Sequence, residues 1–201
     1  MIESKKTYGV LLTRGQPFHI GHIAVIEQAL KENDRVLVVI GSADKCNTDR
    51  NPLCDETRRF LFSKLKKYLG LCGSKRLSFL CLADWSDDNH IPYESSVGST
   101  NTDFESVNKE WGMYLYYNIV SCIRVKDFNF YYNDNLDIIK SWFPKYIDER
   151  VHVITSKRIP RVSSSEVRQA FKDDNMSYLV KVLPYLTEEE LDSFKERFIN
   201  L

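Results

Sequence analysis

A doubly wound α/β fold, built on a parallel sheet of five strands, is the architecture that this sequence predicts. Five short apolar runs alternate with stretches of helical periodicity along most of the 201 residues. Residues 35–41 (RVLVVIG) contain an unbroken apolar run rich in valine, which is typical of a parallel strand buried on both faces. Residues 8–41 read as strand, helix and strand, which is the βαβ unit with its right-handed crossover.

The amino-terminal elements can be justified in order. Residues 8–13 (YGVLLT) read as a buried strand, and the apolar residues of 20–33 recur at helical spacing. After the strand at 35–41, residues 54–70 predict a second helix and residues 76–83 (RLSFLCLA) a third strand. A polar stretch over 84–103 then interrupts the alternation.

The carboxyl-terminal elements continue the same alternation. The predicted elements are a helix at 104–120, a strand at 127–132, a helix at 135–143, a strand at 150–155 and helices at 165–174 and 187–200. Thr187 and Glu190 have the spacing of a capping box and predict the start of the last helix.

Composition excludes several classes of protein. The length fits one domain, and 43% hydrophobic residues indicate an ordinary globular core. Lysine plus arginine and aspartate plus glutamate both number 28, so the net charge is zero, which argues against a surface that coats nucleic acid. No run has the length of a membrane span, and the first ten residues do not read as a signal peptide.

Five scattered cysteines contain no C-x-x-C pair, so the sequence predicts neither a disulfide framework nor a zinc site. We therefore expect a reducing, cytoplasmic setting.

The first candidate site is RGQPFHIGH, residues 14–22, between the first predicted strand and helix. Ligands of doubly wound sheets bind beyond the carboxyl ends of the strands. Gly21 lies in the first turn of the helix, where backbone N–H groups favour an anion, and His19 and His22 can donate to the same anion. Arg14 adds a guanidinium fork suited to phosphate. The alternatives are an ordinary turn with structural histidines, or a metal site that lacks a nearby third ligand.

The second candidate site is RVSSSEVRQAF, residues 161–171, at another predicted helix start. Serine hydroxyls, with Arg168 one turn into the helix, are again suited to phosphate. Taken alone, a plain N-cap with Glu166 and Arg168 in solvent explains this segment better. Two such helix starts in one α/β chain favour the phosphate interpretation.

These residues carry a family resemblance. RGQPFHIGH and VSSSEVR (162–168) resemble the paired H-x-G-H and I-S-S-T-x-x-R motifs of the nucleotidyltransferase superfamily. Within it, the chain is similar to nicotinamide-nucleotide adenylyltransferases of the archaeal type, and GSADKCNTDRNPLCDETRR (41–59) resembles a third segment of that family. FYYNDN (130–135) lies where the family has a strand ending in an Asn-Asn turn. The resemblance implies one Rossmann-like nucleotidyltransferase domain over 1–201, with an α/β core at 8–174 and carboxyl-terminal helices at 175–201.

The resemblance implies a role for each matching residue. His19 and His22 would hold the ATP phosphates and stabilise the transition state, and Arg14 and Arg168 would grip the triphosphate. The other implied ATP contacts are Gly15, Phe18, Gly21, Ser163, Ser164, Ser165 and Asn133. The implied contacts to the nicotinamide nucleotide are Gly41, Ser42, Arg50, Asn51, Arg58, Asp84 and Trp111. Trp85 competes with Trp111 for stacking on the nicotinamide ring, and core packing is an alternative for either tryptophan.

The implied reaction transfers the adenylyl group of ATP to nicotinamide mononucleotide and yields NAD and pyrophosphate. The attacking phosphate has a second pKa of about 6 and is largely a dianion at neutral pH, so no general base is expected. Mg²⁺ would be held by substrate oxygens and water, without dedicated protein ligands. The expected partners are these nucleotides and further copies of the chain in a homo-oligomer, with no nucleic acid and no membrane. The alternatives are a related transferase with another phosphorylated acceptor, such as phosphopantetheine, and a non-catalytic NAD or ATP sensor.

Overall fold

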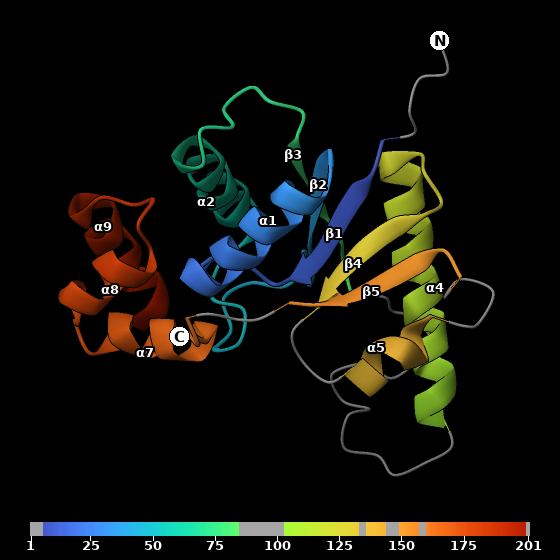
Figure 1. Ribbon diagram of the computed structural model, residues 1–201. Helices are drawn as coiled ribbons and strands as arrows, with labels where there is room; N and C mark the ends of the chain where they lie inside the picture. Colours follow the sequence, from blue (N-terminus) through green and yellow to red (C-terminus); the bar gives the residue numbers. More distant parts are fainter. Residues whose placement is uncertain (1–5, 85–102, 133–135, 144–148, 157–159, 200–201) are drawn as a thin grey trace.

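The fold is a doubly wound α/β sheet, which confirms the sequence prediction. The computed structural model describes residues 6–84, 103–132, 136–143, 149–156 and 160–199. Its sheet has five parallel strands in the order β3-β2-β1-β4-β5 (Figure 1). The strands are β1 (Tyr8–Thr13), β2 (Arg35–Ile40), β3 (Leu77–Cys81), β4 (Phe128–Tyr132) and β5 (Val151–Thr155).

Helices cover both faces of this sheet. The helices are α1 (Ile20–Glu32), α2 (Asp55–Tyr68), α4 (Asp103–Ile123), α5 (Leu136–Trp142), α7 (Ser164–Lys172), α8 (Met176–Val182) and α9 (Glu188–Ile199). Figure 1 shows α1 and α2 on one face and α4 and α5 on the other, with α7, α8 and α9 gathered beyond α1 and α2. No helix of the described segments is long and apolar enough to cross a membrane.

Alternation along the strands divides the core into two layers. In β2, Val36, Val38 and Ile40 face the layer that includes α1, α2 and the carboxyl-terminal helices. Leu37 and Val39 face the layer of α4 and α5. All five side chains are fully buried, which explains why β2 is apolar from Val36 onward and does not alternate with polar residues.

The strand order sets the position of the site. From β1 the chain proceeds outward through β2 to β3, and it then returns to place β4 on the other side of β1. The loops that follow β1 and β4 therefore diverge at the carboxyl edge of the sheet. This divergence is the switch point at which ligands bind in such sheets.

Most predicted elements have boundaries within a few residues of the observed ones. The capping box of the last helix is confirmed, because the Glu190 N–H donates to Thr187 Oγ1 at 3.2 Å and the Thr187 N–H to Glu190 Oε2 at 3.0 Å. The sequence predicted the last helix at 187–200 and helical structure from 175 onward, without bounds for a separate helix before 187, and the structure places α8 there. Of the polar stretch at 84–103, residues 85–102 lie outside the described residues, and the domain boundary at 175 stays a prediction.

Gly112 allows α4 and α5 to pack backbone against backbone. A Cβ atom added at this position would overlap the backbone carbonyl of Trp142 at the end of α5. We expect Gly112→Ala to lower the free energy of unfolding by about 1–3 kcal/mol, because the two helices must move apart. Urea denaturation followed by circular dichroism measures this change. Ser121→Ala, on the exposed face of α4, is the control, and equal midpoints for the two variants would contradict the close approach.

Candidate active site

The turn after β1 is shaped by Gly15 and Phe18. Gly15 has a φ of +60°, and a Cβ atom there would lie 2.6 Å from the Phe18 ring. Phe18 is fully buried and packs edge-to-face on Phe62, with ring centroids 5.8 Å apart. Both residues were predicted to bind ATP, and the structure gives each a clear structural role in the turn.

The two histidines close the start of α1. The Gly21 N–H donates to His19 Nδ1 at 3.2 Å, and the His19 N–H donates to His22 Nδ1 at 3.2 Å. The pair forms a reciprocal capping box in which His19 is the N-cap, and the two rings lie 3.9 Å apart. The sequence interpretation left the Gly21 N–H for an anion, but His19 already accepts it. In each neutral ring, Nδ1 accepts and Nε2 therefore carries the hydrogen.

Two residues that sequence reasoning missed hold this turn in place. The Gln16 side chain is buried and pairs with the Leu53 backbone, since its Nε2 donates to Leu53 O at 3.0 Å and its Oε1 accepts from Leu53 N at 2.9 Å. The Tyr185 hydroxyl donates to Phe18 O at 2.7 Å. Burial raises the pKa of Tyr185 and keeps this hydroxyl protonated.

The second predicted segment lies against the first. Ser163 is the N-cap of α7 and forms a capping box with Glu166, so the plain N-cap interpretation holds for that serine. Arg168 donates to Ser165 Oγ at 3.0 Å and to Gln16 O at 3.3 Å. The latter bond joins α7 directly to the turn after β1, as the phosphate-site hypothesis requires.

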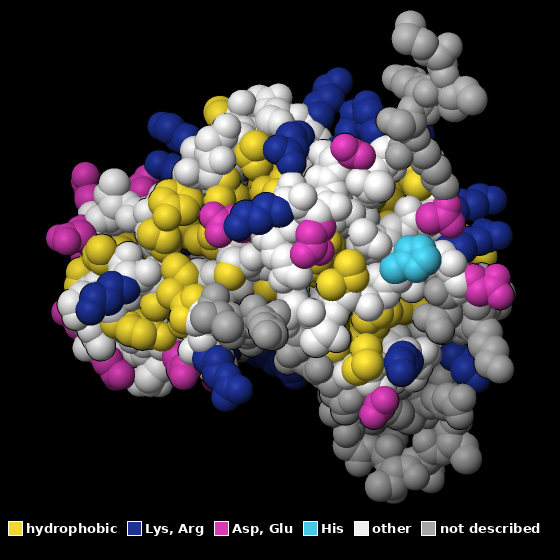
Figure 2. Space-filling view, in the orientation of Figure 1, with side chains coloured by type: hydrophobic (Ala, Val, Ile, Leu, Met, Phe, Trp, Pro, Cys, Tyr) yellow, Lys and Arg dark blue, Asp and Glu magenta, His cyan; other side chains and the backbone are white. Residues whose placement is uncertain are grey.

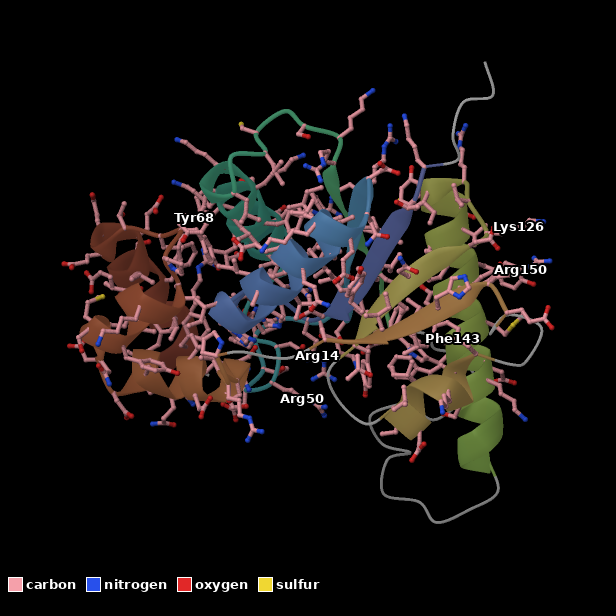
Figure 3. All side chains as sticks on the ribbon, viewed as in Figure 1. Arg14, Arg50, Tyr68, Lys126, Phe143 and Arg150 are labelled. Atoms are coloured by element: carbon pink, nitrogen blue, oxygen red, sulfur yellow. The ribbon has the colours of Figure 1, made fainter. Side chains whose placement is uncertain are left out.

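Three arginines converge where these segments meet. Burial lowers the pKa of Arg168, and the positive charges of Arg14 and Arg50 lower it further, while Asp49 opposes this change. Figure 3 shows Arg14 and Arg50 near the end of the sheet toward which the strand arrows point. On the face drawn in Figure 2, by contrast, basic and acidic side chains are mixed. Arginines that repel one another at a helix start form a ready anion site.

Arg58 is a buried brace between two loops. Its side chain is fully buried, and its guanidinium donates to Arg14 O at 3.2 Å, Gly41 O at 2.9 Å and Ser42 O at 3.0 Å. Burial lowers its pKa, but an arginine remains charged. The resemblance implied a contact between Arg58 and the nicotinamide nucleotide. The geometry supports an indirect role, in which Arg58 positions the segments that follow β1 and β2.

Other predicted residues gather at the ends of β2 and β3. Ser42 Oγ donates to Asp84 Oδ1 at 2.9 Å, and Lys45 Nζ forms an ion pair with Asp84 Oδ2 at 2.6 Å. Asn51 is 2% exposed, and its Oδ1 atom has no hydrogen-bond partner among the described residues. A buried acceptor without a donor is costly, so a ligand that donates there would be stabilised.

The packing of Trp111 bears on the prediction that this residue stacks on the nicotinamide ring. Trp111 is 7% exposed and packs edge-to-face on Trp142, with ring centroids 6.3 Å apart. This arrangement favours the core-packing alternative, and stacking on nicotinamide stays a prediction. Trp85 and Asn133, which were also predicted to lie in the site, fall outside the described residues.

The side chains around the site decide whether the protein itself could bind a metal ion. Across the described segments, no group of three or more histidine, cysteine, aspartate or glutamate side chains is placed to bind a metal ion. The two site histidines point their Nδ1 atoms at backbone N–H groups, so neither offers that nitrogen to a metal. These residues fit a cation whose ligands come mainly from a substrate.

Comparisons with known proteins agree with this geometry. The profile of the cytidylyltransferase-like family matches residues 14–170, which include the first candidate segment and all but the last residue of the second. A nicotinamide-nucleotide adenylyltransferase of Thermoplasma volcanium is 36% identical over 64 residues, 32% of this chain and 36% of the relative. One from Halobacterium salinarum strain R1 is 43% identical over 58 residues, 29% of this chain and 33% of the relative. The matches thus span about a third of the length of these curated relatives.

Solved structures share the fold. A bifunctional NMN adenylyltransferase/ADP ribose pyrophosphatase from Francisella tularensis superposes with a TM-score of 0.71 at 19% identity, covering 98% of this chain and 52% of that one. The NadR protein in complex with NAD and AMP-PNP has a TM-score of 0.57 at 17% identity, covering 90% and 46%. These likenesses confirm the nucleotidyltransferase-type Rossmann-like sheet.

Proposed function

This chain belongs to the cytidylyltransferase-like family, and on that premise we propose that it transfers the adenylyl group of ATP to nicotinamide mononucleotide. The products are NAD and pyrophosphate. The short identical segments shared with archaeal nicotinamide-nucleotide adenylyltransferases support this acceptor among those that the family uses.

The meeting of the two motif segments is the observation that carries the proposal, since Arg168 donates to Gln16 O at 3.3 Å, two residues from Arg14. Like charges gathered at one place favour an anionic ligand there. A triphosphate lying between the starts of α1 and α7 would neutralise the arginine charges and would meet the favourable ends of both helix dipoles. Ser164 and Ser165 lie at the start of α7, where a hydroxyl donor would meet the same phosphates.

The histidines supply donors in this arrangement. Because both Nδ1 atoms accept backbone N–H groups, the Nε2–H of each ring is the hydrogen that can face a phosphoryl oxygen. We assign His22, which is half-buried, to the charge that develops on the α-phosphate. His19 is fully buried, so its contribution rests on the capping geometry as much as on its Nε2–H.

The nicotinamide nucleotide would occupy the ends of β2 and β3. Gly41, Ser42 and Asp84 border this region, and Asn51 Oδ1 would accept a hydrogen bond from the substrate. Trp111 and Trp85 are the two candidates for stacking on the nicotinamide ring.

The chemistry requires positioning and charge stabilisation. A phosphate oxygen of the mononucleotide attacks the α-phosphorus of ATP in line, the new P–O bond forms, and the bond to pyrophosphate breaks with its electron pair. No proton needs to leave the attacking dianion, so the lack of an acid–base dyad among these residues fits the reaction. A divalent ion, for which we propose Mg²⁺, would offset charge on the triphosphate when bound.

A direct assay tests the proposal. Purified protein is mixed with ATP, Mg²⁺ and nicotinamide mononucleotide, and we expect chromatography to show NAD with one pyrophosphate released per NAD. A parallel reaction with phosphopantetheine is expected to release little pyrophosphate, and equal or greater release would identify another branch of the family. Calorimetric binding of ATP or NAD without any pyrophosphate release would identify a sensor and would overturn the proposal.

We also propose that the chain works as a homo-oligomer. Light scattering during gel filtration tests this, and a mass near 23.5 kDa would show a monomer and contradict it.

A further inference from the structure

Thr13, the last residue of β1, is the residue to which the ring of His22 is anchored. Its Oγ1 atom lies 2.8 Å from His22 Nε2 and accepts the Gly15 N–H at 3.2 Å. Nothing in the sequence marks Thr13, because a single threonine at the end of a strand is common. The contact became visible only when the strand and the helix were placed together.

The direction of the Thr13–His22 bond follows from the bonds around it. The His19 backbone N–H can only donate, so His22 Nδ1 accepts from it and carries no hydrogen in the neutral ring. The hydrogen of that ring is therefore on Nε2, which donates to Thr13 Oγ1. The two bonds at opposite sides of the ring fix both its tautomer and its rotation about the Cβ–Cγ bond.

Thr13 is itself rigid, which makes it a useful anchor. It pairs with Ile40 in the register of β1 and β2, and its backbone carbonyl accepts the Gly41 N–H at 2.9 Å. A ring held by a residue at the carboxyl end of a central strand keeps its position more accurately than a ring held by a loop. A flipped ring would lose both bonds, because Nδ1 would exchange places with Cδ2, and Nε2 with Cε1.

We propose that Thr13 is a positioning residue for the adenylyl transfer, and that it acts by holding the Nε2–H of His22 toward the phosphate site. The inference rests on the proposed function, because the value of an oriented donor depends on a developing negative charge nearby. The Nε2–H of His22 would then have two acceptors when nucleotide binds. One is Thr13 Oγ1, and the other is a phosphoryl oxygen that shares the same hydrogen. Serine retains the necessary oxygen, whereas valine retains the shape and loses it.

The first experiment needs no substrate. Nitrogen NMR of the ligand-free protein at a pH at which His22 is neutral reports which ring nitrogen carries the hydrogen. We expect all three proteins to carry the hydrogen on Nε2, because each retains the His19 N–H that selects this tautomer. Only Thr13→Val should show a shifted Nε2 signal and a mobile ring, because valine cannot accept a hydrogen bond from the Nε2–H. An unchanged His22 signal in Thr13→Val would overturn the proposal, whatever reaction the protein catalyses.

The second experiment measures turnover. For Thr13→Val we expect kcat to fall about tenfold, the equivalent of one hydrogen bond, with little change in KM, and for Thr13→Ser we expect kcat near that of wild type. Thr155→Val, at the exposed end of β5, is the matched control. Equal kcat in wild type and Thr13→Val would contradict the proposal, and so would a higher kcat, since that would show that Thr13 withholds His22 from the phosphate.

The two experiments separate the possible failures. If wild-type protein forms no NAD but the His22 Nε2 signal changes as expected in Thr13→Val, the proposed function fails and the Thr13–His22 bond stands. If wild type forms NAD and neither readout responds to Thr13→Val, the positioning role alone fails. Thermal unfolding of each variant shows whether a variant with lower kcat is still folded.

Discussion

His22→Ala is expected to lower the turnover of adenylyl transfer by about 100- to 1,000-fold, which is the usual cost of removing one preorganised donor from a developing charge. The Nε2–H of His22 is held in a fixed direction by two hydrogen bonds, so it needs no reorganisation as the α-phosphate gains charge. Its loss should lower kcat and kcat/KM together, because the interaction strengthens in the transition state. Steady-state formation of NAD measures both quantities.

The alanine variant also removes a cap from α1, so a second substitution is needed to separate stability from catalysis. In His22→Asn, the side-chain oxygen can still accept the His19 N–H, but no atom reaches the place of Nε2. We expect this variant to unfold close to the wild-type temperature and to remain as inactive as His22→Ala. His152→Ala, on the exposed surface of β5, is the control for loss of a histidine. Near-normal turnover in both His22 variants would remove this ring from the mechanism.

Arg58→Met is expected to lower the free energy of unfolding by about 3–5 kcal/mol, because it leaves buried carbonyl groups without their charged donor. Methionine preserves much of the volume of the stem but cannot bond to Arg14 O, Gly41 O and Ser42 O. These carbonyls belong to the loops after β1 and β2, so the loss should loosen the arginine cluster as well. Urea denaturation measures stability, and ATP titration of the folded protein measures binding.

The neighbouring residue supplies a matched control. Arg59 lies on the exposed side of α2 and forms an ion pair with Asp55 across one helical turn. Such exposed pairs contribute less than about 1 kcal/mol, so Arg59→Met should be nearly neutral. If the two variants had similar stability, Arg58 would not brace the loops. If Arg58→Met were stable but failed to bind the mononucleotide, the direct contact implied by the family resemblance would be the better account.

Periodicity predicted the fold well because the strands are buried on both faces and the helices on one. The valine-rich run at 35–41 indicated a strand clearly, and the observed β2 ends one residue earlier than predicted. The short helix α8 was not separated from α9, because its seven residues carry too little periodicity to set a boundary.

The site was predictable in outline and not in detail. The H-x-G-H and serine–arginine patterns marked two segments, and the Arg168–Gln16 bond brings them together. Sequence reasoning could not foresee that His19 and His22 cap one another, since that depends on how the backbone enters α1. It also could not distinguish a ligand-binding arginine from a buried brace such as Arg58, or a stacking tryptophan from a core residue such as Trp111. Those distinctions depend on burial, which long-range packing decides.

The residues that complete the phosphate site come from opposite ends of the chain. Gln16 and Arg168 are 152 positions apart, and Phe18 and Tyr185 are 167 apart. A polypeptide still on the ribosome with only its first half exposed can pair β1, β2 and β3, yet it has neither the late arginine nor the late tyrosine. On the proposed function, a nascent chain that has not yet reached Arg168 and Tyr185 is therefore expected not to retain ATP.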